Sequence, residues 1–251
     1  MPHPLLRDLA HRPWPVPSAP WVMTQTWNAL LFAHWPVSAA HMAALLPPDL
    51  TLDTFNGQAW VGVVPFGITG IRPRALPPIP GFTGFLELNV RTYVTRHGKP
   101  GVWFFSLDAA SRLGVEGARL TYHLPYFNAA MSMQREGDTV RYSSTRTDRR
   151  AGAGTFEASY RPTGGVYRSQ PGTLDHFLTE RYCLYSRSRG GRLYRANIHH
   201  APWPLQPAVA EIRINTVAEA FGIALPNVPP LLHYVKQIPV LAWYLEGAEI
   251  S

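Results

Sequence analysis

Residues 85–131 decide the fold, and they read FLELNVRTYVTRHGKPGVWFFSLDAASRLGVEGARLTYHLPYFNAAM. At the start of this stretch apolar and polar residues alternate. The apolar positions are Leu86, Leu88, Val90 and Val94. Such a period of two predicts a β-strand with one apolar face. The opposite face carries Phe85, Glu87, Asn89, Arg91 and Tyr93. That face fits either a solvated strand surface or the wall of a polar cavity.

The stretch continues as a hairpin. A turn at residues 97–100 is followed by GVWFFSLDA, which is rich in aromatic and β-branched residues and therefore predicts a second strand. We expect the two strands to form the centre of the sheet. Residues 110–119 predict a short helix that two glycines weaken, and residues 124–127 predict an extended step into another strand.

The rest of the chain predicts many short strands and few helices. Strands are expected at residues 21–35, 50–55, 59–64, 129–135, 139–145, 154–161, 182–187 and 193–199. Ser38 and Thr173 are predicted helix N-caps, and residues 216–223 have a helical pattern. Asn56-Gly57 is the strongest turn signal. Residues 65–83 predict a Pro/Gly-rich loop, either a binding loop or a lid, just before Glu87.

Length and composition indicate one domain over residues 1–251, with residues 1–20 as a proline-rich arm. The 25 prolines and 20 glycines suit short strands joined by tight turns. The sequence has no run of eighteen apolar residues and no secretory leader, so we expect a cytoplasmic protein without a membrane span. Cys183, the single cysteine, is predicted to be a small buried hydrophobic residue.

The formal charge of +7 raises the question of nucleic-acid binding. The positive residues are almost all arginines, and they are spread along the chain rather than gathered in a nucleic-acid-binding motif. We therefore expect solvated arginine faces and no nucleic-acid partner. The apolar, aromatic segment at residues 231–245 is long enough to dock across the core or a second subunit, which leaves a homo-oligomer open.

Several segments in order, ELNVRTYV, GKPGVWFFSLDA, ARLTYHLPYFNA, FLTERYCLY and NIHHAPWPLQPA, resemble the YqjF-like proteins, a family of unknown function. That family is in turn distantly similar to acetoacetate decarboxylase. The resemblance implies a mainly β (α+β) fold, an antiparallel β-barrel-like cone around a buried pocket, with a few short helices.

The same resemblance argues against the decarboxylase reaction. It places Tyr126 where the decarboxylases carry the lysine that forms a Schiff base, and Phe127 where they carry its neighbouring lysine. Neither a phenol nor a phenyl ring can form an imine. Glu87 falls at the position of an active-site glutamate, so part of the pocket is expected to persist. The fold is therefore better supported than the reaction.

The candidate site residues follow from both arguments. Candidate catalytic residues are Glu87 as a proton shuttle, Tyr126 as a donor to an enolate and Arg119, with Arg91 as the alternative, as a carboxylate clamp. Candidate substrate-binding residues are Asn89, Arg91, His123, Glu180 and Arg181. The structural alternatives are a wet strand face for Glu87, Asn89 and Arg91, packing for Tyr126, and an anchoring ion pair for Glu180 and Arg181.

We expect neither a metal nor a cofactor. His199-His200 is the most metal-like feature, but adjacent residues of a strand point to opposite faces. The prediction is a buried pocket for a small anionic organic molecule, with lyase-like or enolate chemistry on keto or hydroxy acids if the protein is an enzyme. The alternative is a non-catalytic binding or protein-interaction module whose pocket is vestigial.

Overall fold

The predicted hairpin is present at the centre of the sheet. The computed structural model describes residues 3–77 and 84–248. Strands β4 (Gly84–Arg96) and β5 (Lys99–Ala109) pair antiparallel from Glu87 opposite Ala109 to Arg96 opposite Lys99. The turn between them takes positive φ angles of 48° at His97 and 72° at Gly98. A glycine favours this left-handed turn because it has no Cβ to clash.

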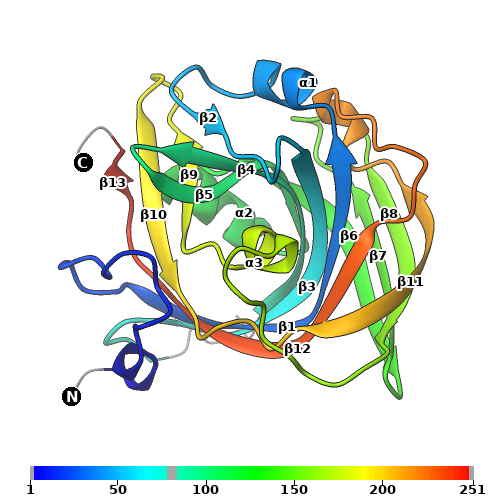
Figure 1. Cartoon of the computed structure of the whole chain (residues 1–251), viewed down its shortest axis with the longest axis horizontal. Coiled ribbons are helices and arrows are strands. Elements are labelled where there is room, and N and C mark those ends of the chain that lie inside the picture. The colour runs from blue at the N-terminus through cyan, green and yellow to red at the C-terminus, as the bar shows by residue number, and fades with distance from the viewer. Residues whose placement is uncertain (1–2, 78–83, 249–251) are drawn as a thin grey trace.

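The strands of the described chain form one sheet in which strand order departs from sequence order (Figure 1). The order is β13-β10-β9-β5-β6-β7-β8-β11-β12-β1-β3-β4-β2. The further strands are β1 (Met23–Val37), β2 (Thr51–Leu52), β3 (Ala59–Pro73), β6 (Tyr126–Glu136), β7 (Thr139–Arg146), β8 (Thr155–Pro162), β9 (Cys183–Arg187), β10 (Leu193–His199), β11 (Gln206–Asn215), β12 (Leu231–Ala242) and β13 (Glu246–Gly247).

Two extra pairings close this sheet on itself twice. Because β4 also pairs with β5, strands β5-β6-β7-β8-β11-β12-β1-β3-β4 form a closed circuit. Because β10 also pairs with β12, strands β5-β9-β10-β12-β1-β3-β4 form a second circuit. Strands β12, β1, β3, β4 and β5 belong to both circuits, so each of them presents one face to each interior.

An apolar core fills the larger circuit. Leu31 of β1, Val63 of β3 and Leu88 of β4 are fully buried there against Phe156 and Tyr160 of β8. The intervening residues of the same strands, Leu30 and Phe32 for example, belong to a different cluster on the side of the smaller circuit. The alternation read from the sequence therefore divides the shared strands between two interiors.

Short helices connect and cover the strands. They are α1 (Ala39–Ala44), α2 (Arg112–Thr121) and α3 (Leu174–Thr179), with 3-10 turns η1 (Pro4–Arg7) and η2 (Glu219–Phe221). The side chains of Ser38, Ser111 and Thr173 accept backbone N–H bonds at the helix starts, which confirms the predicted caps at Ser38 and Thr173. Within the described residues, no helix is long and apolar enough to cross a membrane.

Two pairings are parallel, which the expectation of an antiparallel sheet did not include. Strand β5 pairs in parallel with β6 and with β9. A parallel neighbour requires a crossover connection, and α2 lies in the segment that carries the chain from β5 to β6. The helix thereby packs beside the start of β6, where Tyr126 is the first residue.

Other predictions divide between correct and wrong. The Asn56-Gly57 turn is present with positive φ at both residues, and Cys183 is fully buried. The hairpin expected around that turn is wrong, because β2 pairs with β4 and only an isolated Phe55–Gln58 bridge spans the turn. The predicted loop at residues 65–83 is wrong up to residue 73, because β3 continues to Pro73 with Val64, Phe66 and Ile68 buried; residues 78–83 lie outside the described chain. Residues 216–223 form only the single turn η2, and β11 had not been predicted.

The amino-terminal arm lies against β10 (Figure 1). The Arg12 guanidinium donates a 2.7 Å bond from Nη1 to the Ile198 carbonyl, and Trp14 Nε1 donates to Asn197 Oδ1 at 3.2 Å. Nε2 of His199 lies 2.7 Å from the Leu5 carbonyl oxygen. The arm is thus bound along its length by polar contacts to one strand.

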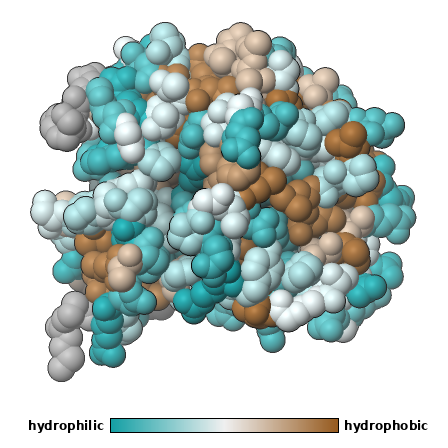
Figure 2. Space-filling model, viewed as in Figure 1, coloured by the Kyte–Doolittle hydropathy of each residue, from teal (hydrophilic) through white to brown (hydrophobic). Residues whose placement is uncertain are grey.

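Hydrophilic residues make up much of the molecular face in Figure 2, with hydrophobic residues gathered near its centre and upper edge. Leu113 and Leu120, both on α2, are among the most exposed large apolar side chains. These features agree with a mixed surface, and self-association stays a prediction.

A buried ion pair ties β5 to β7. Arg146 donates from Nε to Asp108 Oδ1 at 2.8 Å and from Nη2 to Oδ2 at 3.1 Å, and both side chains have 0% exposure. Burial nevertheless raises the pKa of Asp108, against the lowering effect of Arg146. Loss of one partner would leave the other as an unpaired charge in a low-dielectric interior.

We expect Arg146→Met to lower the free energy of unfolding at neutral pH by about 3–5 kcal/mol, because it strands the Asp108 carboxylate. Urea denaturation measures this change. Arg141→Met is the matched control, since Arg141 forms an exposed ion pair with Glu136 and contributes little. Equal effects of the two substitutions would show that the buried pair does not hold β5 and β7 together.

Candidate functional site

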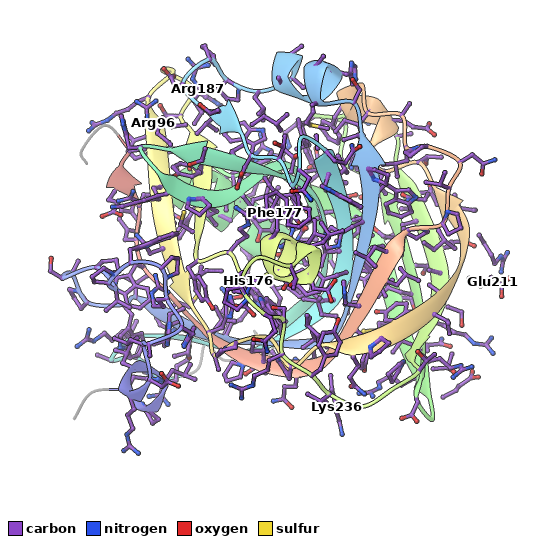
Figure 3. The ribbon with its side chains drawn as sticks, in the orientation of Figure 1. Arg96, His176, Phe177, Arg187, Glu211 and Lys236 are labelled. Atoms are coloured by element: carbon purple, nitrogen blue, oxygen red, sulfur yellow. The ribbon has the colours of Figure 1, made fainter. Side chains whose placement is uncertain are left out.

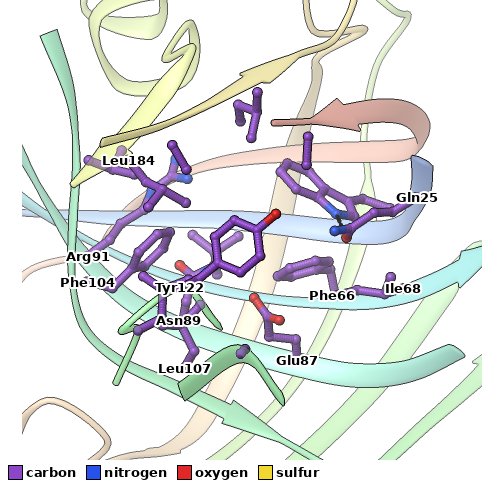
Figure 4. Close-up of a pocket in the computed structure, with 18 of the residues that line it drawn as sticks. Gln25, Phe66, Ile68, Glu87, Asn89, Arg91, Phe104, Leu107, Tyr122 and Leu184 are labelled. Carbon is purple, nitrogen blue, oxygen red and sulfur yellow. Dashed lines mark hydrogen bonds between the residues drawn. The ribbon is translucent and has the colours of Figure 1, made fainter. Parts of the chain in front are cut away.

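The smaller circuit of strands encloses a cavity of about 290 Å³ (Figure 4). Its walls come from β1, β3, β4, β5, β9, β10 and β12, with α2 and the start of β6 at one side. Most of the lining is apolar, for example Phe32, Phe66, Phe104 and Trp203. A few polar side chains therefore stand out against an apolar background, as is usual for sites that bind small organic molecules.

Glu87 is the buried carboxyl of this cavity. It projects from β4 with 3% exposure, opposite Phe66 of β3 and Ala109 of β5. Burial raises the pKa of Glu87 to about 7, although hydrogen bonds from Tyr126 and Asn89 oppose the rise. A carboxyl with this pKa is present in both protonation states near neutral pH, which suits it to accept and return a proton.

Tyr126 holds Glu87 in place. Its hydroxyl donates a 2.7 Å hydrogen bond to Glu87 Oε2, and both side chains line the cavity. The pairing of Tyr126 with Leu107 on β5 brings the phenol to this position. In this arrangement the single hydroxyl proton of Tyr126 lies in the bond to Glu87, which fixes the orientation of the Glu87 carboxyl.

Arg91 is a buried cation without a carboxylate partner. Its exposure is 8%, and among the described residues it forms no ion pair. Nη2 donates to the Leu178 carbonyl at 3.2 Å, while Nε is buried without a hydrogen-bond partner. The guanidinium carbon lies 5.1 Å from the centre of the Phe32 ring. A buried charge of this kind is costly until an anion neutralises it.

Two further polar atoms at the cavity wall have no partner. Asn89 Oδ1 and Trp203 Nε1 are buried, and neither forms a hydrogen bond with a described residue. Buried polar groups in proteins are nearly always paired, so each unpaired one calls for an explanation. Both residues belong to the cavity wall, Asn89 with an unpaired acceptor atom and Trp203 with an unpaired donor.

Arg181 lines the cavity, but its charge is already neutralised. Nη1 donates to Asp53 Oδ2 at 2.6 Å, and Nε donates to the Phe177 carbonyl at 2.7 Å. Glu180 does not line the cavity; its carboxylate accepts bonds from the Tyr182 hydroxyl and from the Trp203 backbone N–H. These contacts agree with the alternative interpretation, in which Glu180 and Arg181 anchor the local structure and do not bind a substrate.

The remaining candidates lie outside the cavity wall. Arg119 is on the last turn of α2 and donates from Nη1 to the Tyr126 carbonyl at 2.7 Å, with its guanidinium over the Phe127 ring. His123 takes a positive φ of 53° after the helix, and its ring packs on Tyr194. Neither side chain contributes to the cavity lining, whereas Arg91, the other arginine considered for the carboxylate clamp, does.

Other lining residues were missed from the sequence. Gln25, Asn197 and Trp203 come from β1, β10 and the loop after it, segments far apart in the chain. Met23, Gln25 and Trp27 are alternate residues of β1 and all face the cavity, so the period of two in this strand carried a signal for Gln25. Asn197 and Trp203 become part of the site only through the pairing of β10 with β9 and β12.

The described residues contain no group of three or more His, Cys, Asp or Glu side chains that could hold a metal ion. His199 and His200, the metal-like pair of the sequence, contact the carbonyls of Leu5 and Ala201. Of the two lysines in the sequence, Lys99 lies at the β4–β5 hairpin and Lys236 points outward from β12 (Figure 3). Neither lines the cavity.

Solved structures with similar folds confirm the expected architecture. The enduracididine biosynthesis enzyme MppR, solved in complex with pyruvate, superposes with a TM-score of 0.66 at 14% identity over 92% of this chain and 91% of MppR. Acetoacetate decarboxylase from Legionella pneumophila gives a TM-score of 0.62 at 15% identity over 95% and 92% of the two chains. At these identities the likeness concerns the fold alone.

Sequence comparison gives the family. The uncharacterized protein YqjF of Bacillus subtilis (strain 168) is 53% identical over 230 residues, which cover 92% of this chain and 94% of YqjF. The sequence model of DUF2071, described as an uncharacterized conserved protein, matches residues 24–239. The chain therefore belongs to the DUF2071 family and has the acetoacetate decarboxylase-like fold.

Proposed function

We propose that the cavity binds a small organic acid and that Glu87 transfers a proton at a carbon next to a carbonyl group. The observation that carries this proposal is a carboxyl group buried in a cavity, with a pKa of about 7 and a tyrosine holding one oxygen. Perturbed carboxyls in cavities are typical of general acid–base catalysts. The similarity in fold to MppR, whose complex contains the keto acid pyruvate, supports the ligand class.

Arg91 is the residue that favours an acid as the ligand. Its buried guanidinium has a free Nε donor and no carboxylate partner in the described chain. A ligand carboxylate would neutralise the charge and accept the free N–H, and a charged hydrogen bond of this type is among the stronger ones in proteins. Arg181, the other arginine at the wall, is already paired with Asp53.

The reaction class needs no group beyond the chain and the ligand. Ionised Glu87 takes a proton from the carbon next to the carbonyl. The electron pair of the broken C–H bond forms a carbon–carbon double bond, and the π pair of the carbonyl moves to its oxygen, which gives an enolate. Protonated Glu87 then returns the proton to the same carbon or to another. An imine with a lysine is not part of this scheme, because neither lysine of the chain lines the cavity.

Binding without turnover is the competing function. The apolar lining favours it, because that lining can hold the apolar body of an acid. Binding of the carboxylate requires Arg91, but it does not require an ionisable Glu87. The Glu87→Gln experiment below distinguishes the two functions, because this substitution removes proton transfer and leaves the anion site at Arg91 unchanged.

For the enzyme, Glu87→Gln should slow proton–deuterium exchange of a bound oxo acid by about 100-fold or more, because an amide cannot accept the proton. Nuclear magnetic resonance in D2O measures the exchange over a panel of short and medium-chain oxo acids. Tyr126→Phe should move the midpoint of the pH–rate profile above 7, because the Tyr126 hydrogen bond lowers the pKa of Glu87. Exchange that is unchanged in Glu87→Gln would leave binding as the only function.

Glu87 should also make stability depend on pH. Its pKa is about 7 in the folded protein against an ordinary value of 4.5, so the folded state holds the proton more tightly. The contribution of the Glu87 proton to the free energy of unfolding is therefore fully present below about pH 4.5, and it is lost as pH rises through about 7. Relative to wild type, Glu87→Gln should gain up to about 3 kcal/mol across this range in denaturation experiments.

The control for this pH series is Glu211→Gln, at an exposed position on β11 that points away from the ribbon (Figure 3). Glu211→Gln should change the pH dependence of the free energy of unfolding less than Glu87→Gln does. If wild type and Glu87→Gln show parallel pH profiles, the Glu87 carboxyl has an ordinary pKa and the proton-transfer role loses its basis.

Arg91→Met should weaken binding of the acid by about tenfold or more, because it removes a buried charged hydrogen bond. Isothermal titration calorimetry gives the dissociation constants. Arg119→Met is the matched control, since Arg119 bonds to the Tyr126 carbonyl and does not line the cavity. Loss of affinity in Arg119→Met with none in Arg91→Met would place the anion site at α2 instead.

A further inference from the structure

Three polar side chains follow one another along a single wall of the cavity. Glu87, Asn89 and Arg91 are alternate residues of β4, and all three line the cavity. The register of β4 with β3 is continuous over this stretch, from Phe66 opposite Glu87 to Gly62 opposite Arg91. The bulge at Val90/Arg91 is in the pairing with β5 instead, where Phe105 is passed over. Strand β4 is therefore regular between Glu87 and Arg91.

Regular strand geometry sets the distance between the two charged groups. Alternate residues lie about 6.5–7 Å apart, so the Cα atoms of Glu87 and Arg91 are separated by about 13 Å. Both side chains leave the same face of the strand, and in Figure 4 they stand apart along β4 with Asn89 between them. A molecule that touches both head groups must extend along the strand.

The two ends have separate surroundings. The Arg91 guanidinium lies near the Phe32 and Tyr93 rings and bonds to the Leu178 carbonyl. Glu87 bonds to Tyr126, at the start of β6. These contacts hold each head group at its own end.

The wall between the two ends is largely apolar. Val64 of β3 and Leu107 of β5 stand opposite Asn89, and Phe104 of β5 stands opposite Arg91. All three line the cavity. Apolar walls favour an alkyl or aryl segment at this point, because burying it releases water from both surfaces.

We infer that the ligand is an elongated oxo acid, whose carboxylate lies at Arg91 and whose carbonyl lies several bonds away at Glu87, with an apolar segment between them. This inference rests on the proposed proton transfer by Glu87. A short 2-oxo acid carries its carbonyl next to its carboxylate. It reaches one end of the row of side chains and not the other.

Positional isomers of one acid test the inference. The probes are 2-oxooctanoate, 4-oxooctanoate and 7-oxooctanoate, which have the same atoms and the same charge and differ only in the place of the carbonyl. Calorimetry measures binding, and proton–deuterium exchange next to the carbonyl measures access to Glu87. Wild type, Arg91→Met and Glu87→Gln are compared with each probe.

We expect 7-oxooctanoate to undergo exchange that depends on Glu87, at a rate at least about tenfold above that of 2-oxooctanoate at saturation. In Arg91→Met, affinity for all three isomers should fall together, because the carboxylate is common to them. Tighter binding and faster exchange of 2-oxooctanoate would overturn the inference and leave the proposed function standing. Exchange with no isomer and with no acid of the wider panel would remove the proposed function and this inference with it.

Discussion

Burial of both faces of β4 is the constraint on which the structure depends. Leu88 and Val90 pack into the core of the larger circuit, while Glu87 and Arg91, on the opposite face, enter the cavity of the smaller one. A shift of the pairing by one residue would exchange these faces and bury the charged groups in the apolar core. The same alternation that closes the core thus fixes which side chains meet a ligand.

Enclosure also explains the chemistry of the polar groups. A carboxyl or a guanidinium taken from water into an apolar interior loses hydration, and it must change its proton affinity or find a partner. Asp108 finds Arg146, whereas Glu87 keeps a tyrosine hydroxyl and a raised pKa, and Arg91 keeps an unpaired donor. The contrast separates a pair that serves the fold from two groups that remain available within the cavity.

Local pattern predicted much of the fold and part of the site. The alternation in residues 85–94 placed Glu87, Asn89 and Arg91 on one face, and the Asn56-Gly57 turn and the Ser38 cap were visible as local signals. The loop expected at residues 65–83 was wrong because buried β3 residues outweighed the nearby prolines and glycines. Trp203 could not be assigned to the site, since only the long-range pairings around β10 bring it there.

The arm that precedes β1 supports the cavity from outside. Arg12 and Trp14 bond to Ile198 and Asn197, which form part of the cavity wall, although neither arm residue lines the cavity. The shape of the wall therefore depends on residues that a molecule in the cavity does not touch.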